Sequence, residues 1–291
     1  MTKKQILARA TLSLSALAVV AAARPAGPTR DAGAPGHVRA LAVLPGATVT
    51  LDAAAARPTA GRIAPLGTGR WVWTAPPTPG LYPIKMVAPD GSDSVTVQAF
   101  VVVPYDQLRG DFLNGYRIGR YPKSPPAGFV EVTPENQDVL VSPHFRLKQF
   151  LCKQPGARKY VVVNERLYAA LEYVLARVNA AGYRATSFHV MSGYRTPAYN
   201  RSIGNVVFSQ HQWGSAADIF IDENGDGRMD DLNGDGRSDI RDAEVLYRVI
   251  DAAAARPEGQ GLIGGIGKYP PTSAHGPFVH VDVRPGGAAR W

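Results

Sequence analysis

Three possible metal ligands lie in two separated stretches of the C-terminal half. His211 and Asp218 lie within residues 192–218, and His280 lies within the stretch FVHVD at 278–282. Two histidine nitrogens, one carboxylate oxygen and an open position for water are the ligand set of a catalytic zinc ion. Water bound to such an ion loses a proton near neutral pH, while the ion polarises a carbonyl group under attack. These residue types therefore indicate hydrolytic zinc chemistry.

Strands rather than one helix must bring these ligands together. The interval from His211 to Asp218 is too wide for one helical face, which excludes the HExxH arrangement. Small residues from Gly214 onward predict a turn that enters a strand over residues 217–221. Valines alternate with His280 and Asp282, which predicts a second strand with both polar side chains on one face.

The surrounding sequence predicts an α+β domain over residues 133–291, with a central antiparallel sheet and flanking helices. Its clearest helix starts at Asn164, a good N-cap, and ends at Gly182. Apolar residues recur within it at helical spacing, so we expect it to cover one face of the sheet. A short buried segment around Phe145 to Phe150 should precede it.

An all-β domain is predicted before it. Residues 37–104 contain short apolar stretches separated by Pro and Gly turns at roughly ten-residue spacing, typical of an antiparallel sandwich. The pattern resembles small immunoglobulin-like modules. Trp71 and Trp73 should lie on one strand face and fill the core, the alternative being a sugar-stacking patch. Proline-rich residues 105–132 are predicted to be an extended linker.

The N-terminus has the pattern of an export signal. Lys3, Lys4 and Arg9 precede an apolar run that ends in small residues near Ala23. The run is shorter than the roughly 20 residues of a spanning helix, so no integral membrane segment is expected after signal removal. The alternative is an anchoring N-terminal helix. Residues 24–36, rich in Pro, Gly and Ala, should form a flexible tether, and the protein should be periplasmic or secreted.

Charge and cysteine content limit the possible partners. Removing residues 1–23, which carry three basic and no acidic residues, lowers the formal charge from +8 to +5. This mild excess suits an anionic polymer such as a cell wall and is too weak to indicate nucleic acid. The single cysteine, Cys152, cannot form an internal disulfide and is expected to be buried. Oligomeric state is not predicted.

Three ordered motifs carry a resemblance to a known family. SGYRTPAYN at 192–200, SQHQWGSAADIFI at 209–221, and GGIGKYP followed by FVHVD and a terminal RW resemble the zinc D-alanyl-D-alanine metallopeptidases of bacterial cell walls. Lysostaphin and hedgehog domains form part of the same wider group, and the murein endopeptidase branch is the most similar. The resemblance covers about residues 133–291.

The resemblance implies roles for particular residues. His211, Asp218 and His280 match the zinc ligands, Arg195 matches the arginine that holds the substrate carboxylate, and Ser209 matches a serine that hydrogen-bonds the substrate. A guanidinium also suits bidentate carboxylate binding on physical grounds. The alternative for Arg195 is a structural pair with an acidic residue of the domain.

The proton-transfer group is not assigned by motif. Many relatives carry a glutamate three residues, or a histidine two residues, before the last ligand, where this chain has Pro277 and Phe278. His275 could act from its Gly/Pro-flanked loop, or could be an exposed loop residue. Asp282 could accept a proton, or could orient a ligand histidine from behind.

An acidic insertion at 222–242 follows the second ligand and predicts calcium binding. Oxygen-bearing side chains at alternate positions followed by Gly are how a short loop wraps a hard cation, and the insertion resembles dockerin loops. The predicted ligands are Asp231, Asn233, Asp235, Asp239 and Asp242, with the Arg237 carbonyl. A possible second site comprises Asp222, Asn224, Asp226 and Asp230, with Arg228. The alternative is a solvated acidic loop.

Together these observations predict an exported zinc metallopeptidase that cuts peptidoglycan stem peptides or cross-links with zinc-activated water. The sequence does not distinguish a carboxypeptidase from an endopeptidase. The alternative is a zinc-containing cell-wall-binding protein without turnover, because Pro277 and Phe278 replace the familiar catalytic groups.

Overall fold

The computed structural model describes residues 37–88, 91 and 94–291. The predicted signal segment and tether lie outside these residues. The described part contains strands from one end to the other and α-helices in its C-terminal half, as an α+β chain requires. Within this part, none of the helices combines the length and apolar character needed to span a membrane.

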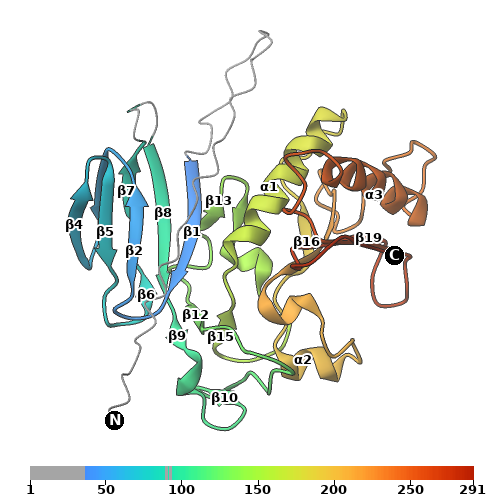
Figure 1. Cartoon of the computed structure of the whole chain (residues 1–291). Helices are drawn as coiled ribbons and strands as arrows, with labels where there is room; N and C mark the ends of the chain where they lie inside the picture. Colours follow the sequence, from blue (N-terminus) through green and yellow to red (C-terminus); the bar gives the residue numbers. More distant parts are fainter. Residues whose placement is uncertain (1–36, 89–90, 92–93) are drawn as a thin grey trace, which may run out of the picture.

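Two sheets form the N-terminal part, on the left in Figure 1. They enclose a shared core in which Trp73 is fully buried and Trp71 packs at the edge. Each indole nitrogen donates to a backbone carbonyl, Trp71 to Ala53 at 3.0 Å and Trp73 to Ala60 at 2.9 Å. The core prediction for Trp73 is therefore confirmed. One sheet contains β1 (His37–Val43), β8 (Ser94–Val101), β7 (Ile84–Val87), β3 (Ala55–Pro58) and β6 (Gly80–Leu81), and the other contains β2 (Thr48–Asp52), β5 (Arg70–Thr74) and β4 (Arg62–Gly67).

The first sheet is mixed, whereas the sequence predicted antiparallel pairing. β1 runs parallel to β8 over seven residue pairs, from His37 with Val95 to Val43 with Val101. Alternating apolar residues identify a strand but do not carry its direction, because side chains alternate identically in both kinds of ladder.

The predicted linker packs into the larger core. β12 (Gly128–Val132) pairs with β9 (Val103–Pro104) on one side and with β15 (Lys159–Val161) on the other. Phe129 within it is fully buried. Pro122, Pro125 and Pro126 precede β12 and lie outside it, so they do not interrupt its pairing. The segment also contains η1 (Tyr105–Gln107), β10 (Phe112–Leu113) and β11 (Tyr116–Arg117).

A five-stranded sheet in the C-terminal part presents the predicted ligands. Its order is β16 (His189–Ser192), β17 (Ala216–Phe220), β19 (Phe278–Asp282), β18 (Gly265–Tyr269) and β20 (Ala289–Arg290). The first four strands pair antiparallel, and β20 pairs parallel to β18. Smaller elements nearby are β13 (Leu140–Ser142), β14 (Phe145–Arg146), η2 (Leu147–Phe150) and α2 (Pro197–Ser202).

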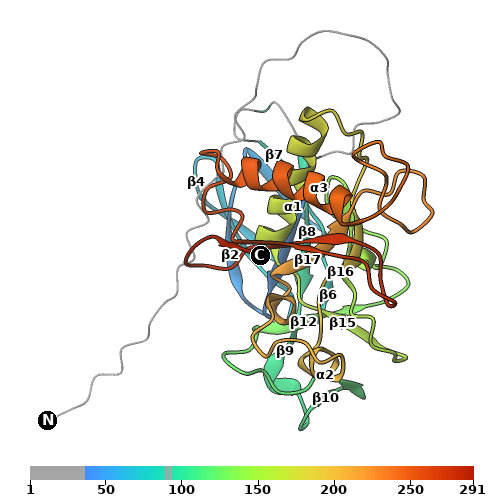
Figure 2. The same cartoon turned by 90° about the vertical axis from the view of Figure 1, so that its right-hand side faces the viewer.

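Two long helices support this sheet. α1 (Glu165–Ala180) starts where Asn164 Oδ1 accepts the backbone N–H groups of Arg166 and Leu167, as the sequence predicted. α3 (Ile240–Ala254) packs on β18 and β19 and contacts α1, to which it is joined by a hydrogen bond from Tyr173 to the Ala253 carbonyl at 3.0 Å. Figure 2 shows α3 along one side of the sheet and α2 at the other end of the molecule.

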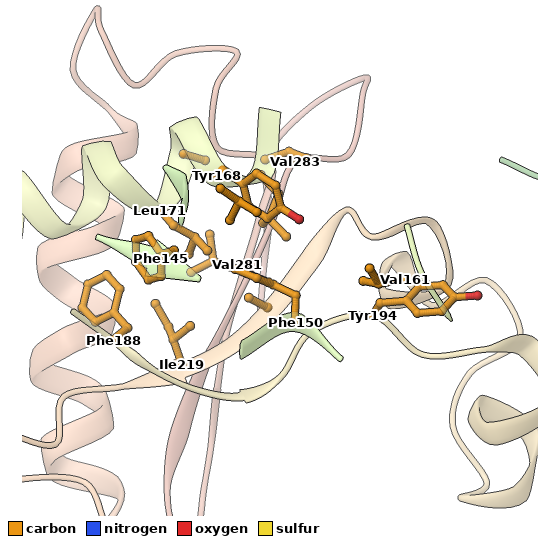
Figure 3. Close-up of a cluster of buried hydrophobic side chains, with 14 of the residues drawn as sticks. Phe145, Phe150, Val161, Tyr168, Leu171, Phe188, Tyr194, Ile219, Val281 and Val283 are labelled. Atoms are coloured by element: carbon orange, nitrogen blue, oxygen red, sulfur yellow. The ribbon is translucent and has the colours of Figure 1, made fainter. Parts of the chain in front are cut away.

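The core between the helices and the sheet is shown in Figure 3. Ile219 of β17 and Val281 of β19 are fully buried and belong to one cluster with Leu171 of α1. Phe145 and Phe150, predicted to be buried, are 0% and 2% exposed and belong to the same cluster. The apolar faces of β17 and β19 are thus fixed against helices, and their polar side chains face the opposite side.

Candidate metal centre

Strand register brings two of the three predicted ligands face to face. In the antiparallel pair of β17 and β19, Asp218 lies directly opposite His280. Directly opposed residues of such a pair have Cβ atoms about 4.5–5.5 Å apart. Both side chains are almost fully buried.

The third ligand comes from a short 3-10 helix just before β17. η3 (Gln210–Trp213) carries His211 and ends at Gly214, whose φ of 61° is left-handed. A Cβ atom at Gly214 would lie 2.5 Å from the Val162 carbonyl oxygen. Only glycine fits both constraints, and the turn it makes leads the chain directly into the strand that carries Asp218.

The three donor atoms form a triangle. His211 Nε2 lies 3.2 Å from Asp218 Oδ1 and 3.2 Å from His280 Nδ1, and His280 Nδ1 lies 2.8 Å from Asp218 Oδ1. Zinc bonds of about 2.0–2.2 Å in tetrahedral geometry place ligand atoms about 3.3 Å apart. The donors are therefore spaced like one face of a tetrahedral zinc site.

The other nitrogen of each histidine has its own acceptor. His211 Nδ1 donates to the Gly193 carbonyl at 2.6 Å, and His280 Nε2 donates to Asp282 Oδ2 at 3.2 Å. Such contacts fix the tautomer and ring orientation of metal-binding histidines. They leave His211 Nε2 and His280 Nδ1 as the metal-facing atoms, so the residues present fit a zinc ion.

Charges in this cluster balance one another. Burial opposes ionisation of Asp218, but His211 and His280 outweigh it and hold the pKa of its carboxyl well below the usual value. Burial also lowers the pKa of His211, which favours the neutral imidazole that metals bind. Burial also acts to lower the pKa of His280, but hydrogen bonds with Asp218 and Asp282 outweigh it and raise that pKa overall.

A cavity of about 340 Å³ opens onto the three donors. Its lining includes Arg195 and Ser209, which the resemblance had assigned to substrate binding. The sequence had not assigned a role to the other lining residues, although four of them, Gln210, Tyr269, Phe278 and Trp291, lie in motifs that carry the family resemblance. The other lining residues are Asn205, Val206, Val207, Phe208, Gln210, Tyr269, Phe278, Arg284 and Trp291.

Arg195 forms an ion pair with Asp218, one of the predicted metal ligands. Its Nη2 donates to Asp218 Oδ2, and its Nε donates to Ser192 Oγ at 2.8 Å. Ser192 lies opposite Asp218 in the sheet, so the three residues form a row. Arg195 therefore forms the structural pair with an acidic residue that was the alternative to substrate binding. Its side chain also borders the cavity.

Neither candidate for proton transfer lines the cavity. Asp282 is fully buried behind His280, where it accepts hydrogen bonds from the Gly265 N–H at 2.8 Å and from Arg284. Burial opposes its ionisation, but His280 and Arg284 keep its pKa well below the usual value. His275 lies on the preceding loop, where its ring packs edge-on against Phe278 at 5.0 Å. These positions suit Asp282 for orienting His280.

The acidic side chains predicted to bind calcium do not form a group of three that are close enough to share an ion. Within residues 37–88, 91 and 94–291, the one group of acidic, His or Cys side chains close enough to share an ion is His211, Asp218 and His280. Arg241 pairs at 2.8 Å with both Asp235 and Asp239, two of the predicted ligands. Asp242, fully buried, accepts the backbone N–H groups of Leu232 and Asp239 at 2.8 Å. Calcium binding here stays a prediction.

The possible second calcium site, in residues 222–230, is likewise held by internal hydrogen bonds. Asp222 accepts the N–H groups of Asp226 at 3.0 Å and Gly227 at 3.1 Å, and Asp230 accepts that of Glu223 at 3.0 Å.

Comparison with known proteins agrees with this geometry. Residues 143–233 match the family model of Peptidase M15. The match includes His211 and Asp218 and ends before His280. It supports the zinc D-alanyl-D-alanine peptidase family and hence a metallopeptidase. No curated protein matches the chain.

Proposed function

We propose that this protein is an exported zinc peptidase that hydrolyses peptide bonds in peptidoglycan stem peptides or their cross-links. The observation that carries the proposal is the donor triangle of His211, Asp218 and His280, with edges of 2.8–3.2 Å and both histidines oriented from behind. The Peptidase M15 match over residues 143–233 supports the same reaction class. The branch assignment to murein endopeptidases is part of the proposal.

Each residue near the centre has a defined part in this function. His211, Asp218 and His280 would hold the ion, which when bound would polarise the scissile carbonyl and make its water acidic. Arg195 is ion-paired with Asp218 and presents a guanidinium at the cavity, where it can bind a substrate carboxylate. Ser209 lines the same cavity and can donate a hydrogen bond to the peptide backbone.

A second function is favoured by one specific observation. Among side chains, the described lining of the cavity contains no carboxylate other than Asp218 and no histidine other than His211 and His280. A general base would normally be within hydrogen-bonding reach of the reacting group. A zinc-containing protein that binds the cell wall without cutting it is therefore the alternative.

One experiment separates the two functions. The full chain would be loaded with zinc, its metal content measured, and the protein incubated with purified peptidoglycan. We expect soluble peptides or D-alanine, identified by mass spectrometry, whose masses also tell a carboxypeptidase from an endopeptidase. The Asp218→Ala variant, which removes a ligand, serves as control and should release nothing. Sedimentation with the wall and no soluble product would instead identify a binding protein.

Calcium binding by residues 222–242 belongs to the same proposal and is tested separately. Calorimetric titration of the zinc-loaded chain with calcium should show binding that Asp231→Ala removes. The loop begins four residues after Asp218. Stripping calcium should therefore lower zinc retention, and unchanged retention would show that the loop acts independently of the metal centre.

A further inference from the structure

A second hollow lies between the two long helices of the C-terminal part. It measures about 310 Å³ and is formed by α1, α3 and the turn after α3. Figure 2 shows α3 passing across α1, which it contacts. Three arginines, Arg177, Arg248 and Arg256, border a floor of alanines and one valine, and we call this hollow the arginine groove. It shares no residue with the metal cavity and is therefore a separate site.

Most of the positive charge at the arginine groove is not compensated. Arg248 Nε donates to Glu244 Oε1 at 2.8 Å, but the Arg248 side chain is still 75% exposed. Arg177 and Arg256 form no ion pair with any carboxylate of the described chain. The lining itself contains no acidic side chain. The groove therefore attracts anions.

Arg177 carries a buried donor that lacks an acceptor. Its guanidinium lies over the ring of Tyr173, with Cζ 5.8 Å from the ring centroid, and Tyr173 in turn donates to the Ala253 carbonyl of α3. Arg177 Nε is buried and has no hydrogen-bond partner among the described residues. A favourable interaction with the C-terminal end of α1 explains an arginine at this position but leaves that N–H unsatisfied. Since an unpaired buried donor is costly, an acceptor in the groove would stabilise this side chain.

The spacing of the arginines favours an elongated ligand. Arg248 and Arg256 are eight residues apart on α3 and the turn that follows it, or about 12 Å along the helix axis. A single small anion cannot bridge such a distance. A chain with repeated negative groups can contact both arginines at once.

The chemistry of the lining selects among such chains. Guanidinium groups only donate hydrogen bonds, and the alanine and valine side chains neither donate nor accept. A peptide would find no side-chain acceptor here for its N–H groups. Nucleic-acid bases would find no aromatic side chain in the described lining on which to stack. The groove therefore fits a slim polyanion that is rich in acceptors.

We propose that the arginine groove binds a linear polymer of polyol phosphate. Its phosphodiester oxygens pair with the arginines, whose planar fork matches phosphate geometry, and its short carbon chain lies on the alanine floor. The net basic charge of the chain agrees with an anionic partner of this kind. Binding in the groove holds the protein on such a polymer and leaves the residues of the metal cavity free. The inference goes beyond the proposed function and does not need an active metal centre.

Titration of the full chain with synthetic poly(glycerol phosphate) tests the proposal. Calorimetry should show binding that weakens as salt is added, because salt screens exposed charges. The double variant Arg177→Gln, Arg256→Gln should bind about tenfold more weakly or worse, since hydrogen bonds between charged groups are the strong ones. The matched control Arg57→Gln, Arg70→Gln removes the same charge from exposed positions on β3 and β5 and should bind like the wild type.

Two further variants keep the test independent of folding. Arg256→Gln alone changes an exposed residue and should also weaken binding. Replacement of Arg177 and Arg256 by lysine keeps both charges without the planar forks and should give an intermediate affinity. Circular dichroism should show the same fold in every variant. No binding by the wild type, unchanged binding in the glutamine variants, or an equal loss in the matched control would each overturn the proposal.

Other polyanions give different results in the same titration. Binding of poly-L-glutamate, oligothymidylate or phosphatidylglycerol vesicles that is tighter than that of poly(glycerol phosphate) and is lost in the glutamine double variant would overturn the proposal. The groove would then bind a carboxylate polymer, a nucleic acid or a membrane surface, respectively. Cleavage of soluble stem peptides, measured in parallel, tests the proposed function alone and should be equal in the wild type and the glutamine double variant. Failure of the groove and failure of the enzyme are therefore distinguishable.

Discussion

Replacing Asp282 with asparagine should weaken zinc binding without removing a zinc ligand. The carboxylate is fully buried, and its Oδ2 accepts the Nε2–H of His280 at 3.2 Å while its Oδ1 accepts the Gly265 N–H at 2.8 Å. Asparagine has nearly the same size, but one of its two terminal atoms is a donor. That NH₂ group must face either His280 and Arg284 or the Gly265 N–H, and all of these are donors themselves.

The magnitude follows from the role of Asp282 behind the metal centre. Loss of such a partner typically lowers metal affinity by about 10–100-fold, which corresponds to about 1.4–2.8 kcal/mol. Competition with a chromophoric chelator would measure the affinity, and circular dichroism would verify the fold. Asp251→Asn is the matched control, because Asp251 also pairs with an arginine, Arg290, but is 48% exposed. Wild-type zinc affinity in a folded Asp282→Asn variant would refute the idea that Asp282 orients His280.

Three further predictions concern the turn, the protons and the core. Gly214→Ala should destabilise the protein by about 1–3 kcal/mol and lower its zinc content, because a Cβ atom would lie 2.5 Å from the Val162 carbonyl oxygen at a left-handed φ. Denaturant unfolding measures this loss of stability, and an unchanged unfolding midpoint would contradict the prediction. Zinc affinity should fall as pH decreases, starting above the usual histidine value of about 6.5, because the pKa of His280 is raised and its proton competes with the ion. Affinity measured from pH 8 to 5 that stayed flat would exclude this competition. Leu171→Ala should cost about 2–5 kcal/mol, since the side chain is fully buried between α1 and the sheet, whereas Leu66→Ala on the surface should change stability by less than about 0.5 kcal/mol.

Local sequence signals were sufficient for several elements of the fold. The Asn164 cap and the helical spacing that follows it define α1 to within a residue or two, because capping and amphipathicity depend on neighbours in sequence. The same applies to the existence of β17 and β19, although every residue of both strands is buried, the polar ones included. Strand direction did not follow from such signals, as the parallel pairing of β1 with β8 shows.

The acidic insertion shows a different limit. Its spacing of Asp, Asn and Gly predicted a calcium loop, but the side chain of Arg241 binds two of the predicted ligands, Asp235 and Asp239. Whether a carboxylate faces an ion or a neighbouring guanidinium depends on side-chain orientation, which spacing alone does not specify.

The sequence by itself determined the candidate metal donors, because zinc chemistry requires particular atoms and few residue types supply them. Only the tertiary structure decided how those donors meet: the register of β17 on β19 sets Asp218 opposite His280, and the turn at Gly214 brings His211 to them. It also decided the surroundings, placing Asp282 behind His280 and Val206, Val207 and Phe208 in the lining of the cavity. Residues distant in sequence become neighbours through packing and strand pairing, so the chemistry of the site was readable from residue types and its geometry was not.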